Sequence, residues 1–187
     1  MKNKLLLFAS SLLLLVSCMK EMSESISDES AGLNGGFEKT KNNLPLNWLV
    51  YTQKTTGYGD FSILIDSIKA AEGKRCLHFA VKDCSNTGGR FSPGISTEIK
   101  AQAGNTFKIT CKIKNTGSAF CIRLSGVNAF EASAGPELRS SESIPEWREI
   151  ELKYTLAKEM EKLRLEVNVL SAGDFWIDDL KVEKVKG

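Results

Sequence analysis

Short stretches in which apolar and polar residues alternate recur along most of the chain. Residues 107–113 (FKITCKI) and 120–124 (FCIRL) alternate with a period of two, and an NTGS segment rich in turn-forming residues separates them. A period of two is typical of strands with one buried face, and the turn residues between these two predict a hairpin. The same alternation occurs at residues 77–81, 150–156, 163–169 and 176–182.

This pattern predicts the fold class. We expect about nine or ten short strands joined by Gly-rich turns, without a long amphipathic helix, which is typical of a β-sandwich. The prediction is therefore an all-β protein: one antiparallel β-sandwich of the jelly-roll kind, spanning residues 32–187 of the 187-residue chain. A chain of this length suits one domain of ordinary size.

The N-terminus has a different pattern. Lys2 and Lys4 precede an apolar run over residues 5–16, and Ser17 and Cys18 close it. The run is too short to cross a bilayer as a helix, which needs roughly 20 residues. A basic start, a short apolar core and a small residue before the cleavage point are typical of a secretory signal. We therefore expect residues 1–17 to be removed.

The residues around the cleavage point indicate lipidation. The sequence Leu-Val-Ser-Cys ending at Cys18 resembles a bacterial lipobox, in which the cysteine is acylated and becomes the new N-terminus. Such acyl chains anchor a protein durably, because each buried CH₂ contributes roughly 0.8 kcal/mol. The alternative is an ordinary signal peptide with an incidental cysteine. Met19 is not the Asp that resembles an inner-membrane retention signal, so the outer membrane is favoured.

Residues 18–31 are polar and acidic. They carry few apolar side chains, so we expect a flexible tether between the lipid and the domain. Acidic residues close behind a lipidated cysteine resemble a surface-export signal of some Gram-negative lipoproteins, and a plain solvated spacer is the alternative. The sequence thus predicts a lipid-anchored envelope protein, in the outer membrane and with possible exposure at the cell surface.

Charge and the rare chemical residues exclude several functions. The formal net charge is +2, and removal of Lys2 and Lys4 with the signal leaves a formally neutral mature chain. A nucleic-acid binder would need a basic face, so none is expected. Four cysteines follow Cys18, and the sequence leaves their three possible disulfide pairings open. They are Cys76, Cys84, Cys111 and Cys121.

A family resemblance runs through residues 32–185. Asn34-Gly-Gly-Phe-Glu38, followed by Pro45 and Trp48, resembles the opening of the jelly-roll carbohydrate-binding modules of the CenC type, families 4, 9 and 22. The segments at residues 71–77, 103–107 and 175–180, together with Trp147, resemble later motifs of these modules in the same order. The resemblance implies the galactose-binding-like jelly-roll fold. It does not specify a ligand, because many functions share one fold.

The resemblance also implies a structural Ca²⁺ site. The ligands of the family map onto the carbonyls of Gly36 and Arg75 and the carboxylates of Glu38, Glu72 and Asp178. The parity of the last strand places Asp178 on the same side as Trp176, facing the core. An inward carboxylate is costly without a cation or hydrogen-bond donors, and Ca²⁺ prefers such oxygen ligands. The alternative is that Asp178 pairs with Arg75 or Lys74 and no metal binds.

Such modules bind sugar rings on exposed aromatic side chains, with hydrogen bonds from polar neighbours. The tryptophans occupy core positions of the family, so the candidates lie mostly in loops. The candidate carbohydrate-binding residues are Tyr58, His78, Arg90, Phe91, Arg123 and Phe130. Arg123 and His78 lie on strands, with parity opposite to their apolar neighbours. Loop packing or ordinary surface exposure is the alternative for each of these residues.

These observations favour binding without catalysis. The single histidine, His78, makes triad or multi-histidine metal chemistry improbable, and the sequence shows no G-x-S-x-G, P-loop or H-E-x-x-H motif. No pair of acids stands out for glycoside hydrolysis. We expect an envelope lipoprotein that is not an enzyme and that binds a poly- or oligosaccharide. The alternative is a structural or protein-interaction lipoprotein with the same fold, an envelope protein as partner and no sugar site.

Overall fold

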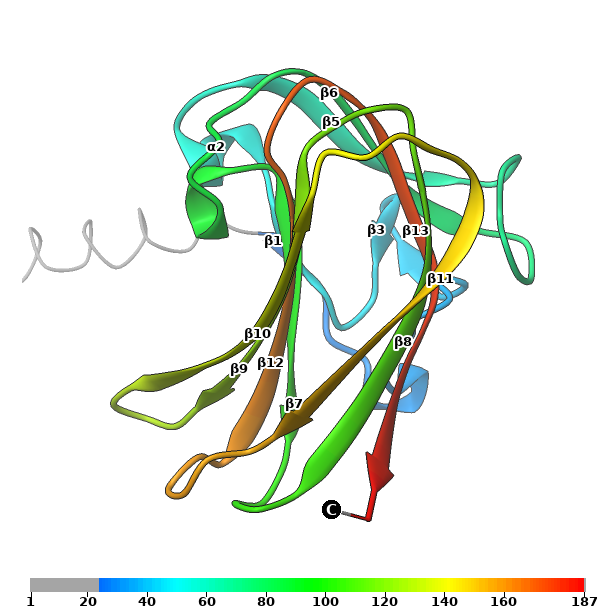
Figure 1. Ribbon diagram of the computed structural model, residues 1–187. Coiled ribbons are helices and arrows are strands. Elements are labelled where there is room, and N and C mark those ends of the chain that lie inside the picture. Colours follow the sequence, from blue (N-terminus) through cyan, green and yellow to red (C-terminus); the bar gives the residue numbers. More distant parts are fainter. Residues whose placement is uncertain (1–23, 187) are drawn as a thin grey trace, which may run out of the picture.

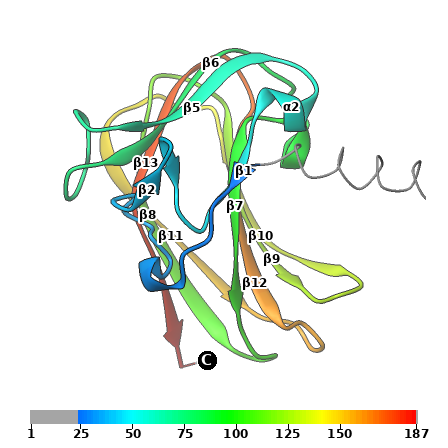
Figure 2. The ribbon, with the colours of Figure 1, turned by 180° about the vertical axis from the view of Figure 1, so that it is seen from behind.

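A computed structural model describes residues 24–186 as a sandwich of two antiparallel sheets (Figures 1 and 2). The expected signal peptide and Cys18 lie outside the described residues. Within the described part, no helix is long and apolar enough to cross a bilayer. The sandwich confirms the fold class that the alternating pattern predicts.

One layer is a six-stranded sheet with the order β1-β4-β7-β12-β9-β10. Its strands are β1 (Glu24–Ser25), β4 (Leu49–Tyr51), β7 (Gly94–Lys100), β12 (Lys162–Val169), β9 (Phe120–Val127) and β10 (Ala132–Ser140). The strands β1 and β4 at one side of this sheet are short, so most of the sheet is built from β7, β12, β9 and β10. A β-bulge between Ala134 and Glu137 interrupts the pairing of β10 with β9.

The other layer is a five-stranded sheet with the order β11-β8-β13-β6-β5. Its strands are β11 (Ile144–Thr155), β8 (Thr106–Asn115), β13 (Gly173–Val185), β6 (Cys76–Asp83) and β5 (Asp60–Asp66). The expected hairpin at residues 107–124 instead joins the two layers, because β8 and β9 belong to different sheets. The short elements that complete the fold are η1 (Glu29–Ala31), β2 (Thr40–Lys41), β3 (Leu44–Pro45), α2 (Gln53–Thr56) and η2 (Gly89–Phe91).

The core fills the space between the two sheets. In β12, Leu163, Leu165 and Val167 are fully buried while the residues between them point outward. From the facing sheet, Ile109 and Ile113 of β8 are buried in the same core, and the residues between them point outward apart from the buried Cys111. Burial of one complete face of each strand is the main contribution to the stability of such a sandwich, at roughly 25 cal/mol per Å² of apolar surface.

A bulge in β13 changes which residues face the core. Phe175 and Ile177 are buried in the core, whereas Trp176 and Asp178 pair with outward-facing residues of the neighbouring strands. The register shifts between Asp178 and Lys181, after which Leu180 faces the core. The expectation that Trp176 and Asp178 share an inward parity with Leu180 is therefore wrong. Both residues are nevertheless buried, because the loop after β5 covers them.

The first described residues lie against the domain. Glu24 and Ser25 pair with β4, and the Asn47 side chain accepts a hydrogen bond from the backbone N–H of Asp28 and donates to the Asp28 and Gly32 carbonyls. Sequence composition assigns these residues to the tether. In the structure, the segment from Glu24 onward is part of the folded domain.

All four cysteines in the described residues are free thiols. Cys111 faces the core, as its parity predicts, and Cys76 and Cys121 are buried on the outer sides of their sheets. Cys84 is partly exposed after β6. None of the three pairings that the sequence left open is formed.

Candidate functional site

The surface of the six-stranded sheet that points away from the five-stranded sheet, here called the outer face, is polar along most of its length. Residues that alternate with the core positions of β7, β12 and β9 project from it. These are Ser96, Glu98, Arg164, Glu166, Asn168 and Arg123. In Figure 1, α2 lies at one end of this sheet and the β9–β10 hairpin curves away from the sandwich at the other.

Tyr51 links the edge of the outer face to its centre. Its hydroxyl donates a hydrogen bond to Glu166 on β12 at 2.6 Å and lies 3.1 Å from the Ser96 hydroxyl on β7. Burial raises the pKa of Tyr51, and the hydrogen bond to Glu166 adds to this effect. The ring is 7% exposed, so its flat surface is not a platform for a sugar.

Arg123 points outward from β9, as its parity predicts, and makes charged contacts on both sides. Its Nε lies 2.8 Å from Glu137 on β10, and its Nη1 lies 3.5 Å from Glu166 on β12. The hydrogen bond from Arg123 lowers the pKa of Glu137. The charge of Arg123 is thus balanced by Glu137 and Glu166 within the protein.

A hollow of about 270 Å³ opens on the outer face beside Tyr51. Its lining includes Thr55, Arg90, Ser96, Glu98 and Arg164. Arg164 donates from Nε and Nη2 to one oxygen of Glu98, at 3.0 and 2.6 Å, and Lys162 reaches the other oxygen at 3.0 Å. Burial raises the pKa of Glu98, but the hydrogen bonds from Arg164 and Lys162 outweigh it and hold the pKa below its usual value.

The loop that carries Arg90 and Phe91 is fixed to the outer face by Asn168. The Asn168 side chain accepts a hydrogen bond from the N–H of Gly89 and donates to the Gly89 carbonyl, both at 2.9 Å. Gly94 permits this approach, because a Cβ there would lie 2.3 Å from the Asn168 amide nitrogen. Two of the sequence candidates therefore lie at the hollow or next to it.

The exposed aromatic candidates do not gather around one groove. Tyr58, Phe91 and Phe130 are 57%, 53% and 95% exposed. Phe91 adjoins the hollow through Arg90, whose guanidinium lies 5.6 Å from the ring centre. The Tyr58 hydroxyl donates to Asp83 at the end of β6, and Phe130 lies in the distant turn between β9 and β10. None of the three lines the hollow, and Phe91 directly follows a residue that does, Arg90.

His78 lies on the opposite side of the molecule. It projects from the five-stranded sheet and stacks on Trp176, with the ring centres 4.4 Å apart and the rings 4° from parallel. Its Nε2 lies 2.7 Å from Asp174. Trp176 is covered in turn by Lys69, and its Nε1 donates to Asp66. His78 therefore cannot belong to the same site as Arg90 and Arg123.

The residues expected to bind Ca²⁺ meet around the turn at residues 71–75. Asp178 accepts hydrogen bonds from the N–H groups of Ala71 and Glu72 at 2.8 and 3.0 Å. Glu38 accepts from the N–H groups of Lys74 and Arg75 at 2.6 and 3.0 Å. The two carboxylates thus hold one turn from both sides. An ideal Cβ on Gly36 would lie 4.0 Å from Asp178, so the turn that contains Gly36 is also close.

The fit of these residues to a metal is partial. Glu72 pairs with Lys112, and the described residues contain no group of three or more His, Cys, Asp or Glu side chains that could hold an ion. Asp178 is fully buried and receives backbone N–H groups rather than the side chain of Arg75, which donates to the Glu38 carbonyl. Burial raises the pKa of Asp178. A cation near this carboxylate would offset its desolvation, with backbone carbonyls as further ligands.

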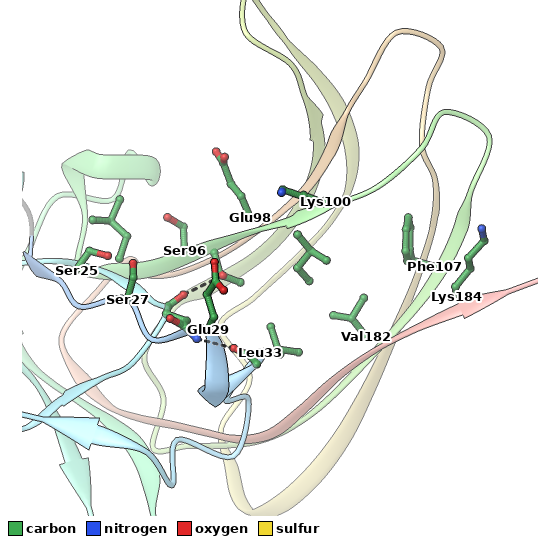
Figure 3. Close-up of a pocket in the computed structure, with 15 residues that line it drawn as sticks. Ser25, Ser27, Glu29, Leu33, Ser96, Glu98, Lys100, Phe107, Val182 and Lys184 are labelled. Carbon is green, nitrogen blue, oxygen red and sulfur yellow. Dashed lines mark hydrogen bonds between the residues drawn. The ribbon is translucent and has the colours of Figure 1, made fainter.

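A larger groove of about 1000 Å³ opens between the two sheets (Figure 3). Its lining is mixed: Leu33, Phe107 and Val182 are apolar, whereas Ser96, Glu98, Lys100 and Lys184 are among its polar residues. None of the carbohydrate-binding candidates from the sequence lines this groove, whereas Arg90 lines the hollow on the outer face. We therefore place the candidate site at the hollow rather than in this groove.

The sequence analysis missed most of the residues at the hollow. Arg164, Glu166 and Asn168 alternate with buried residues in the expected strand at 163–169, so the parity argument that identified Arg123 could also have found them. Tyr51 and Glu98 lie in strands that the sequence analysis did not predict. Their contacts come from the pairing order β4-β7-β12, which the alternation along one strand does not reveal.

Comparison with known proteins supports the fold and not the ligand. No protein-family model matches the sequence, and no curated protein matches it. The structure is similar to the CBM22-1 xylan-binding domain of Paenibacillus barcinonensis Xyn10C, with 12% identity, a TM-score of 0.58, and coverage of 82% of this chain and 93% of that domain. It is also similar to the C-terminal family 22 carbohydrate-binding module of Clostridium thermocellum Xyn10B, with 14% identity, a TM-score of 0.54, and coverage of 81% and 94%.

A third similar structure belongs to a different class of protein. The enzymatically active domain of tailspike protein 4 from bacteriophage CBA120 matches with 12% identity and a TM-score of 0.61, over 81% of this chain but 21% of that one. The chain therefore has the jelly-roll fold of solved carbohydrate-binding modules, as the sequence motifs implied. At these identities the likeness defines the fold alone.

Proposed function

We propose that the protein binds a poly- or oligosaccharide on the outer face of the six-stranded sheet, without catalysis. The observation that carries the proposal is the polar hollow beside Tyr51, on a fold shared with carbohydrate-binding modules. Arg90, Ser96 and Arg164 offer donors there, and Glu98 offers acceptors, for the hydroxyl groups of a sugar. Phe91 supplies an exposed ring at the rim.

Electrostatics favour binding over hydrolysis. A glycoside hydrolase needs a general acid whose pKa is raised, together with a second carboxylate. At the hollow, the pKa of Glu98 is lowered, and on the same face the pKa of Glu137 is lowered too. Carboxylates held in this way remain ionised at neutral pH and cannot donate a proton to a leaving group.

Isothermal titration calorimetry with the full-length protein in mild detergent tests this function. The panel contains xylan, mixed-linkage β-glucan, mannan and polygalacturonate. We expect heat of binding for at least one polymer, and no new reducing ends after prolonged incubation. If no polymer binds, the protein-interaction lipoprotein of the same fold replaces this proposal. If reducing ends accumulate, the protein is an enzyme.

We also propose that Cys18 is acylated and that the domain is attached to the outer membrane, with exposure at the cell surface. The lipobox-like sequence before Cys18 supports this. Metabolic labelling with an alkyne-bearing palmitate should mark the wild-type protein and leave C18A unlabelled. Protease treatment of intact cells should then degrade the anchored domain if it faces outward.

Finally, we propose a structural Ca²⁺ ion near Asp178, bound with oxygens of Gly36, Glu38, Glu72 and Arg75. The buried Asp178 carboxylate, which lacks a cationic side-chain partner among the described residues, supports this. The ion would stabilise the junction of residues 36–38, the turn at residues 71–75 and β13. It would take no part in sugar binding.

A further inference from the structure

We propose that the hollow on the outer face selects an anionic sugar, a uronic acid whose carboxylate lies between Arg90 and Arg164. This rests on the proposed function and specifies its ligand class. Among the described residues that line it, the hollow contains two guanidinium groups and one carboxylate, that of Glu98. One positive charge thus remains without an acidic partner inside the hollow.

Arg90 is the group that lacks a partner. In the described part of the chain, its guanidinium makes no hydrogen bond or ion pair, and its one recorded contact is the Phe91 ring at 5.6 Å. By contrast, the other arginines of the outer face, Arg123 and Arg164, each contact glutamates. An unpaired guanidinium in a hollow is a ready donor for a planar carboxylate, because the two can form paired, charge-assisted hydrogen bonds.

Arg164 can complete the binding of this carboxylate. It uses Nε and Nη2 on a single oxygen of Glu98, so its Nη1 has no hydrogen bond recorded in the described residues. Lys162, which also contacts Glu98, adds a further positive charge beside the hollow. Glu98 is therefore neutralised by two cations, and the local field of the hollow stays positive toward a ligand.

The same face is poorly suited to a neutral polymer held by stacking. Within residues 24–186, Tyr51 is the only aromatic residue that lines the hollow, and its ring is buried and its hydroxyl is bound to Glu166. Phe91 lies at the rim next to Arg90. A ligand here must derive its affinity from hydrogen bonds and charge: a neutral hexose or pentose supplies only the hydrogen bonds, whereas a uronic acid supplies both.

The test compares polygalacturonate with the same polymer after chemical reduction of its carboxyl groups, using the full-length protein in mild detergent. We expect the affinity for the reduced polymer to be at least roughly tenfold lower than the affinity for polygalacturonate. The affinity for polygalacturonate should also fall as the NaCl concentration increases. Equal affinity for both polymers overturns the inference. Binding to xylan alone overturns it too but leaves the proposed function intact, and binding to no polymer means that the proposed function itself fails.

Three variants assign the effect to Arg90. R90A should weaken binding to polygalacturonate roughly tenfold, and R90K should restore only part of the affinity, because lysine lacks the planar fork. R139A is the matched control: it removes the same charge from the edge strand β10, where Arg139 pairs with Glu137, and should bind as the wild type. An R90A protein that melts at the wild-type temperature and binds normally overturns the inference, as does equal loss in R139A.

Discussion

The Tyr51 hydroxyl and the Glu166 carboxylate lie 2.6 Å apart, although the residues are 115 positions apart in the sequence. The contact joins the short strand β4 to β12 across the intervening strand β7. Tyr51 thus holds one side of the Glu166 carboxylate, and Arg123 contacts the other side. The backbone pairing of the sheet positions the strands, and this hydroxyl adds a side-chain contact between two of them beside the hollow.

Replacement of Tyr51 by Phe should lower the free energy of unfolding by about 1–3 kcal/mol, because Glu166 loses a buried donor. Urea denaturation measures this loss. Y58F is a control, since it removes a hydroxyl that binds a carboxylate on the exposed surface. It should lower the free energy of unfolding by less than Y51F does. If Y51F and Y58F cost the same, Tyr51 has no special role in fixing the sheet.

Glu98 should make the stability depend on acid pH. Its folded pKa lies below its usual value, so its contribution to stability is present above the unfolded pKa of about 4.5 and is lost as the pH falls through the folded pKa. The melting temperature of E98Q should therefore lie below that of the wild type at pH 7, and the difference between the two melting temperatures should be smaller at pH 3. A constant difference across this range would contradict the prediction.

Calcium should raise the melting temperature of the wild type. An ion that binds only the folded state at a hundredfold excess over its Kd contributes about 2.7 kcal/mol, or roughly 5–10 °C for a domain of this size. A chelator should reverse the shift, and D178N should abolish it. E183Q removes an exposed carboxylate from the same strand and should keep the shift. An identical melting curve with and without chelator for the wild type would exclude the site.

His78 should matter for stability and not for sugar binding. H78A removes the stack on Trp176 and the contact with Asp174, at a cost of about 1 kcal/mol. Because His78 projects from the five-stranded sheet, affinity for the ligand should equal that of the wild type. R90A should show the opposite combination. Loss of affinity in H78A with unchanged stability would move the site to the other sheet.

The buried thiols should react only after unfolding. Burial raises the pKa of Cys111 to about 12 and the pKa values of Cys84 and Cys121 to about 11, so few thiolates exist at neutral pH and the order of reaction follows exposure. Native protein treated with a thiol reagent should be modified first at Cys84, which is partly exposed. Rapid modification of Cys121 in the native state would indicate that the outer face opens.

The alternation of residues predicted most of the strands well, but it paired residues 107–113 with 120–124 although β8 and β9 lie in different sheets, and it gave the wrong parity for the last strand. Period two is reliable while a strand keeps its register, as in β8 and β12, because each buried face must stay apolar. In β13 the register shifts between Asp178 and Lys181, and a bulge changes the parity without any signal in the apolar pattern. The inward position expected for Trp176 was wrong for this reason.

The candidate site was predicted less well than the fold. Arg123 came from parity within one strand, and Arg90 and Phe91 came from the expectation that exposed aromatic residues and their polar neighbours in loops bind sugar. Tyr51, Glu98 and Glu166 meet because β4, β7 and β12 are neighbours in the sheet, and neighbours in a sheet are set by long-range pairing. His78 shows the converse: its parity was correct, but parity does not say to which sheet a strand belongs.

Pairing of Glu24 with Val50 has a consequence for where the protein can act. Six residue steps separate Cys18 from Glu24, and a fully extended chain of that length spans roughly 20 Å. A lipid on Cys18 would therefore confine the domain to a thin shell above the bilayer. Ligand capture would then favour polymers that reach the membrane surface, and neighbouring copies on one membrane could engage a single polymer together, with the gain in avidity that multivalent attachment gives.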